Sequence, residues 1–79
     1  MKEKIILKGK DYSVILPLKT FFAIVNKLGP NESYTDPNYP DLVFLMEGNH
    51  GVVVTDTVGM QLHVPTDVNN FIKADRKTW

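Results

Sequence analysis

The chain has 79 residues, nine basic and nine acidic side chains, no net charge and no cysteine. A chain this short predicts one small domain, residues 1–79, and the lack of cysteine excludes disulfides and thiolate metal sites. The N-terminal stretch has only three consecutive apolar residues, which are too few for a signal-peptide core or a membrane span. We therefore expect a cytoplasmic protein without membrane contact.

Two β-prone runs open the chain, at Lys4–Lys8 and at residues 12–16, and a short connection containing Gly9 joins them. This pattern predicts a β-hairpin. Lysines at both ends of the first run are typical of a strand at an open sheet edge.

Residues 17–29 predict an amphipathic helix, because apolar side chains recur at steps of three and four along one face. The apolar face consists of Leu18, Phe21, Phe22, Val25 and Leu28. Pro17 suits the first helical turn, and Gly29 in a left-handed conformation, followed by Pro30, ends the helix. Strands from the rest of the chain must cover this face.

Residues 29–41 contain three prolines and no aliphatic side chain, which predicts a long loop. Leu42–Met46 is continuously apolar, as in a central strand that is buried on both faces. Residues 52–55 predict the next strand, and the alternation of residues 60–64 predicts a half-exposed one.

A helix capped by Thr66 or Asp67 should follow and reach Asp75, with a narrow apolar stripe. That stripe consists of Val68, Phe71 and Ile72. The basic and aromatic residues after it are expected to form a frayed tail. They are Arg76, Lys77 and Trp79.

The order ββαβββα predicts an α+β fold, a two-layer, mainly antiparallel sheet of about five strands with two helices packed on it. A small half-open β-barrel with helices is the alternative. The expected core contains Ile5, Leu7, Val14, Leu16, Phe21, Phe22, Val25, Leu28, Val43, Leu45, Val53, Met60, Leu62 and Phe71. Leu42, Phe44, Val52 and Val54 join it if the strand beginning at Leu42 is central.

The sequence contains no strong motif for catalysis or for binding a metal or cofactor. His50 and His63, with Asp56 or Asp67, could supply zinc ligands, but their spacing matches no compact metal motif. The serines lie in no nucleophile elbow, and the glycines do not cluster at a helix N-terminus as phosphate binding requires. We predict no enzyme activity and no catalytic, cofactor or metal site.

Charge is distributed unevenly along the chain. Residues 1–29 hold six lysines and two acids, residues 30–67 hold six acids without Lys or Arg, and residues 68–79 hold three basic side chains and one acid. The segments thus carry +4, −6 and +2. Such asymmetry concerns partners and association.

The acidic middle predicts a protein that docks on a larger protein with a basic surface, as inhibitor, adaptor or regulator. Tyrosines in the loop add contact area at low entropic cost. The predicted partner-binding residues are Glu32, Tyr34, Asp36, Tyr39, Asp41, Glu47 and Asp56. In the competing interpretation these acids balance the lysines of the hairpin and first helix internally.

Two further functions remain open. The basic hairpin, with Tyr12, and the C-terminal tail have the composition of a single-strand nucleic-acid surface, although zero net charge argues against a nucleic-acid partner. The hairpin lysines are Lys2, Lys4, Lys8 and Lys10. A small oligomeric enzyme or ligand-binding subunit is the other alternative. Apolar runs that two short helices leave uncovered also predict a homodimer.

Overall fold

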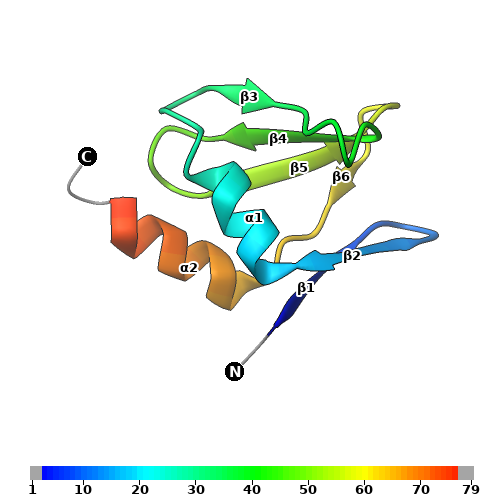
Figure 1. Ribbon diagram of the computed structural model, residues 1–79, viewed down its shortest axis with the longest axis horizontal. Coiled ribbons are helices and arrows are strands. Elements are labelled where there is room, and N and C mark those ends of the chain that lie inside the picture. Colours follow the sequence, from blue (N-terminus) through cyan, green and yellow to red (C-terminus); the bar gives the residue numbers. More distant parts are fainter. Residues whose placement is uncertain (1–2, 77–79) are drawn as a thin grey trace.

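The computed structural model describes residues 3–76 (Figure 1). Within these residues the elements follow the order β1 (Lys4–Lys8), β2 (Ser13–Pro17), α1 (Leu18–Val25), β3 (Ser33–Tyr34), β4 (Leu42–Met46), β5 (Val52–Asp56), β6 (Gln61–Leu62) and α2 (Thr66–Asp75). The predicted α+β class, with antiparallel strands and two helices, is confirmed. Neither helix is long and apolar enough to cross a membrane within the described part of the chain.

The strands form two antiparallel sheets, β1-β2 and β3-β4-β5-β6, instead of one. Strand β3 lies inside the predicted loop and consists of two residues paired with β4, too short to leave a pattern in the sequence. The sheets meet at one isolated bridge, where Lys8 and His63 exchange hydrogen bonds of 3.2 and 2.7 Å. Within residues 3–76 this bridge is the β-pairing that joins the two sheets, which otherwise remain separate.

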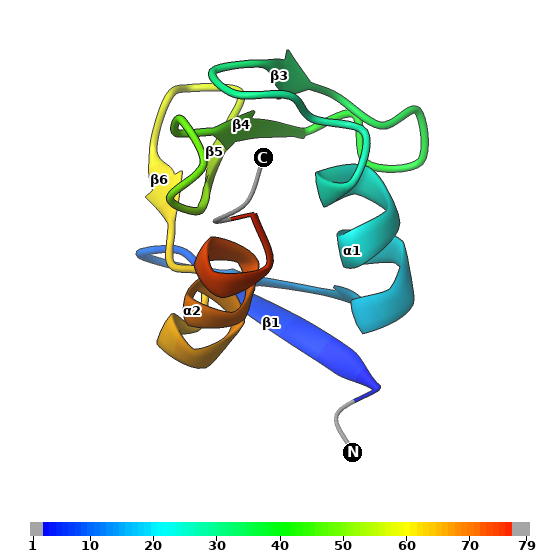
Figure 2. The same cartoon turned by 90° about the vertical axis from the view of Figure 1, so that its left-hand side faces the viewer.

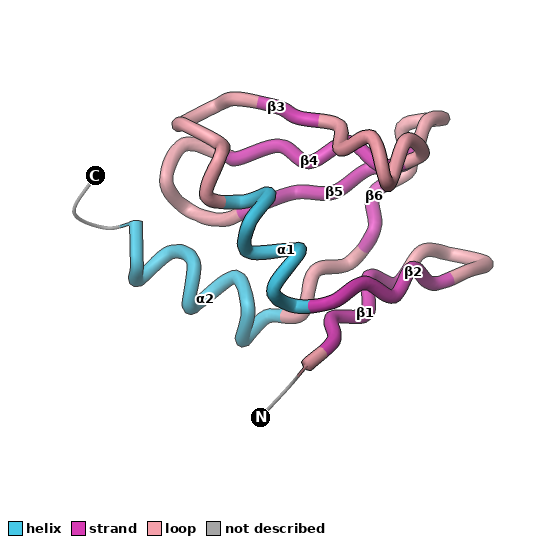
Figure 3. Tube along the Cα trace, viewed as in Figure 1, coloured by secondary structure: helices cyan, strands magenta, loops and turns pink. Residues whose placement is uncertain are grey.

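The four-stranded sheet forms one layer, and α1, α2 and the β1-β2 hairpin lie together against one of its faces (Figures 1 and 2). The tube view shows the same division, with both helices on the side of the hairpin (Figure 3). The opposite face of the four-stranded sheet has no helix over it in residues 3–76.

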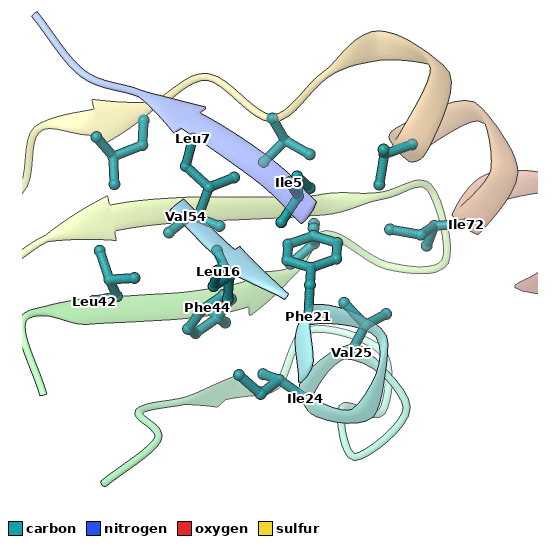
Figure 4. Packing of buried hydrophobic residues seen from close by; sticks show 14 of the residues in the cluster. Ile5, Leu7, Leu16, Phe21, Ile24, Val25, Leu42, Phe44, Val54 and Ile72 are labelled. Carbon is teal, nitrogen blue, oxygen red and sulfur yellow. The ribbon is translucent and has the colours of Figure 1, made fainter. Parts of the chain in front are cut away.

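The core lies between these layers, with Phe21 of α1 near its centre (Figure 4). Its ring packs edge-on against Phe44 of β4, with centroids 6.2 Å apart. The buried hydrophobic residues are Ile5, Leu7, Leu16, Phe21, Ile24, Val25, Leu28, Leu42, Phe44, Met46, Val52, Val54, Leu62, Val64, Val68 and Ile72.

Strand β4 is central in the sheet but is buried on one face, which corrects the expectation of burial on both. Phe44 and its alternating neighbours point into the core, whereas Leu45 is exposed and Val43 half-buried. Val53 on β5 faces outward in the same way. The reason is that no second layer from the described part of the chain covers this side of the sheet.

For four further residues the core prediction is only partly right or is wrong. Val14 and Phe22 are partly buried, whereas Met60 and Phe71 are 51% and 57% exposed. Phe71 and Phe22 contact each other edge-on at 5.4 Å between centroids. Phe22 of α1 and Phe71 of α2 thus form a small aromatic contact at the surface, on the outer side of the two helices.

Helix α1 is shorter than predicted, because Pro17 still belongs to β2 and the helix ends at Val25. Turns follow, and the N–H of Leu28 donates to the Val25 carbonyl at 3.0 Å. The predicted left-handed residue, Gly29, does not have a positive φ. Asn31 does, with φ 63°, so the reversal comes two residues later.

Helix α2 has the predicted extent, but Pro65 is its N-cap residue and neither predicted side chain caps it. Arg76 does not fray. It is buried, and one guanidinium nitrogen donates to the Leu28 carbonyl at 2.7 Å and lies 3.5 Å from Asn49 Oδ1. Burial lowers the pKa of Arg76 from its usual value. The other predicted tail residues lie outside the described residues.

Candidate functional site

The seven residues predicted to bind a partner separate along strand β4. Around its first residue, Leu42, the structure gathers Asp36, Tyr39, Asp41 and Asp56. Leu42 pairs with Asp56 across the ladder, and its N–H donates to the Tyr39 carbonyl at 3.1 Å. Asp36 belongs to the same turn, because its carbonyl accepts the N–H of Tyr39 at 2.9 Å.

Glu32 and Glu47 lie at the opposite end of β4. The N–H of Met46 donates to the Glu32 carbonyl at 3.0 Å, and Glu47 directly follows Met46. Tyr34 pairs with Phe44 between the two ends. A strand advances about 3.3 Å per residue, so roughly 13 Å separates the groups. The predicted residues therefore do not converge on one point.

Asp56 anchors the turn between β5 and β6. Its carboxylate accepts the Tyr12 hydroxyl at 2.8 Å and the N–H groups of Val58 and Met60 at 3.0 and 2.8 Å. The hydrogen bond from Tyr12, followed by those from the backbone, lowers the pKa of Asp56. The same bond raises the pKa of Tyr12, because losing the proton would leave two negative charges in contact. These contacts give the carboxylate a structural role in the turn.

Tyr34 and Tyr39 are half-buried and pack against the core, whereas a docking loop predicts that both are exposed. The Lys27 ammonium lies 5.1 Å from the centre of the Tyr34 ring, in a cation–π arrangement. Tyr39 lines a cavity of about 320 Å³, together with Tyr12 at the tip of the hairpin. Their rings therefore contribute to packing.

The other carboxylates differ in how they are held. Glu32 accepts the N–H of Gly29, and Asp36 accepts the N–H of Asn38 in a local turn. Asp41 and Glu47 are exposed, and within residues 3–76 their carboxylates have no hydrogen-bond partner. None of the seven residues forms a salt bridge with a described lysine. The interpretation in which these acids balance the lysines internally predicts such contacts.

Sequence reasoning missed the outer face of the four-stranded sheet. Leu45 pairs with Val53, and Val43 pairs with Thr55, so these side chains share the sheet face opposite to that of the buried Phe44. Leu45 is 36% exposed and the two valines are half-buried. We call Val43, Leu45 and Val53 the outer strip. A continuous apolar run such as that of β4 does not reveal which of its side chains point outward.

Glu47 lies next to the outer strip, at the Met46 end of β4, and Asp41 at the other end. All four strands of this sheet come from residues 33–62, a part of the chain that contains no Lys or Arg. The outer strip is therefore an apolar surface whose own strands carry acidic and neutral residues only.

The two histidines line one groove of about 300 Å³, beside Glu47 at the edge of β5. Within the described residues, however, no group of three potential ligands could hold a metal ion. The hairpin carries the exposed Lys4, Lys8 and Lys10, but the Tyr12 hydroxyl is bonded to Asp56. That bond places a carboxylate where the nucleic-acid alternative needs a basic aromatic surface.

No family model, curated protein or solved structure matches the chain. Any functional assignment therefore has to come from the surface itself.

Proposed function

We propose that the protein is a non-enzymatic interaction module that docks on the basic surface of a larger protein, as inhibitor, adaptor or regulator. The outer strip, Val43, Leu45 and Val53, forms the centre of the docking surface, with Asp41 and Glu47 at its ends. The other predicted residues lie on β3, at the end of β5 and in the segments that flank β3 and β4, and by their register Tyr34 and Asp56 share the face of Phe44 and Leu42. These other residues are Glu32, Tyr34, Asp36, Tyr39 and Asp56.

One observation supports this proposal above the others. The four-stranded sheet has an apolar strip that no helix of residues 3–76 covers, and its strands contribute no basic side chain. Protein interfaces combine an apolar centre with a polar rim, and complementary charge selects the partner. Leu45 is the natural anchor, because it is the most exposed residue of the strip. Asp41 and Glu47 are the natural rim charges, because both are exposed and neither carboxylate accepts a hydrogen bond within residues 3–76.

Site-specific photo-crosslinking tests the location of the surface. A photoreactive phenylalanine replaces Leu45 in one variant and Phe71 in the control, and both are exposed to extract from the native host. Phe71 is a suitable control because it is exposed on α2, away from the outer strip. We expect a specific protein crosslink at position 45 and none at 71. Crosslinks at 71 only would reject the outer strip.

Binding measurements with the purified partner then test the chemistry. Leu45→Arg should lower affinity by roughly 2 kcal/mol or more, as for an interface anchor. Glu47→Lys should mainly slow association and flatten its salt dependence, since rim charges act through steering. Phe71→Arg serves as the control and should change neither quantity.

The internal-balance interpretation predicts a different result for the acidic residues beside the strip. If Glu32 and Asp36 serve only stability, Glu32→Gln with Asp36→Asn changes unfolding and leaves partner affinity unchanged. Lost stability with unchanged binding in this double variant, together with unchanged binding of Leu45→Arg, would reject the docking surface.

A further inference from the structure

Strand β1 has one edge paired with β2 and one edge that is partly open. The Glu3 carbonyl accepts the N–H of Leu18 at 2.9 Å, which fixes the odd-numbered residues of β1 as those bonded to the β2 side. In an antiparallel ladder the intervening residues direct their backbone groups to the other edge. Those residues are Lys4, Ile6 and Lys8.

Among the described residues, this second edge is covered at one position. Lys8 exchanges two backbone hydrogen bonds with His63. Continuing the same antiparallel register would place Pro65 opposite Ile6, but proline has no N–H and the chain turns there into α2. Within residues 3–76, no backbone bond reaches the outward N–H and carbonyl groups of Lys4 and Ile6. Four hydrogen-bonding groups are thus open.

A groove of about 510 Å³ runs beside this open edge, between β1 and the first turn of α2. Its lining includes Lys4 and Lys8, with Pro65 and Val68 on the helix side, and no carboxylate of residues 3–76 contributes to it. Asp67 belongs to the same helical turn but does not line the groove. An extended segment that enters the groove therefore meets an apolar floor and two ammonium groups.

We propose that this edge binds an extended acidic segment of a partner protein, which adds to β1 as an extra strand. Its backbone pairs with Lys4 and Ile6, as in other cases of strand addition. An apolar side chain lies opposite Ile6, which is 44% exposed, and a carboxylate two residues away lies opposite Lys4. The binding edge consists of residues already held in extended form.

A second copy of this chain is a poor occupant of the same edge. Antiparallel self-pairing centred on Ile6 places Lys4 opposite Lys8 of the second copy, and like charges directly opposite destabilise a sheet. The outward groups of Lys8 are also taken by His63. Lysines on an edge strand commonly prevent this kind of self-association. Charge complementarity therefore selects an acidic partner segment.

This basic edge is separate from the acidic outer strip, since it lies on the hairpin, and the outer strip lies on the far face of the four-stranded sheet (Figures 1 and 3). The two surfaces would bind different partner segments, one acidic and one basic. A failure of either surface in its own test leaves the other standing.

Amide hydrogen exchange on the isotope-labelled protein tests the proposal. The probe is a short synthetic peptide that contains the run valine-threonine-glutamate, so that valine can lie opposite Ile6 and glutamate opposite Lys4 without reaching the position that His63 occupies on this edge. The control peptide has lysine in place of the glutamate. In the free protein the amides of Lys4 and Ile6 should exchange faster than those of Ile5 and Leu7, which are bonded to β2. The glutamate peptide should slow Ile6 by about tenfold or more, and the lysine peptide should not.

Two protein variants test the charge argument. Lys4→Glu should weaken binding of the glutamate peptide by about three- to tenfold, while Lys19→Glu, an exposed change on α1, should leave it unchanged. Equal binding of both peptides would overturn the proposal, and so would protection of Ile6 that rises with protein concentration, which indicates a second copy. Binding of a thymidine oligonucleotide to this edge in preference to the glutamate peptide would also overturn it.

Discussion

The side chain of Asn69 replaces a missing strand at the edge of the four-stranded sheet. Strand β6 pairs with β5 only at Val54 and Thr55, so the edge beside Val52 has no strand partner. Asn69 Oδ1 accepts the Val52 N–H at 3.0 Å, and its Nδ2 donates to the Val52 carbonyl at 3.4 Å. Val52 is only 2% exposed, so water is a poor substitute for these bonds.

Asn69→Ala should therefore destabilise the protein. Leaving a buried N–H without a partner costs about 1–3 kcal/mol, whereas alanine gains up to about 0.7 kcal/mol of helix propensity over asparagine. Asn70→Ala is a matched control, because Asn70 is exposed on the same helix and the propensity gain is the same. Subtracting the two variants removes the propensity contribution. The difference should be about 1–3 kcal/mol.

Urea unfolding measures this difference at neutral pH, with midpoint and slope fitted for both variants. In a thermal scan each kcal/mol corresponds to a shift of about 4–8 °C for a domain of this size. Amide exchange at Val52 gives a local readout, and it should accelerate in Asn69→Ala beyond the change in global stability. Equal stabilities of the two variants, with unchanged exchange at Val52, would refute the assigned role of Asn69.

The remaining predictions concern the core, the loop tyrosine and the acid response. Phe21→Ala should lower the free energy of unfolding by about 3–5 kcal/mol, because Phe21 is fully buried, and Phe22→Ala should lower it by about half as much. Equal losses of the two variants in urea unfolding would contradict this ranking. Tyr34→Ala should lower stability by about 1–2 kcal/mol, and a loss below about 0.5 kcal/mol would show that the ring packs on nothing. Tyr12→Phe should raise the pKa of Asp56, measured by carboxyl NMR, because the strongest bond to the carboxylate is removed. Because the pKa of Asp56 is lowered in the folded state, its carboxylate stabilises the protein above the unfolded pKa of about 3.9, and this stability is lost on acidification. The wild type should therefore lose more stability than Tyr12→Phe below about pH 4. Identical acid unfolding of the two proteins would contradict this prediction.

The sequence alone does not determine the arrangement of the candidate site. It identifies the acidic residues and the tyrosines, and their placement near one loop predicts one exposed patch. The structure instead gives Asp56 a role in a turn and packs Tyr34 and Tyr39 on the core. Whether a loop side chain faces solvent depends on the segments that pack beneath it, and beneath Tyr39 lies the hydrophobic core.

Several elements of the fold follow from the sequence because their signals are local. The hairpin comes from two β-prone runs around a glycine turn, and the core face of α1 comes from spacing at three and four residues. The burial of Phe21, Val25 and Leu28 follows from that spacing. Periodicity is a property of neighbouring residues, so it can be read before the chain is folded.

Tertiary structure decided the features that depend on partners far along the chain. Leu42–Met46 is apolar at every position, so only the layer beneath the sheet determines that Phe44 is buried and Leu45 is open. Arg76 is buried because the Leu28 carbonyl, 48 residues earlier, accepts its hydrogen bond. Strand β3 forms because β4 offers it an edge. In each case the stabilising contact joins segments that no local pattern connects, and the surfaces proposed for binding are those that such contacts leave uncovered.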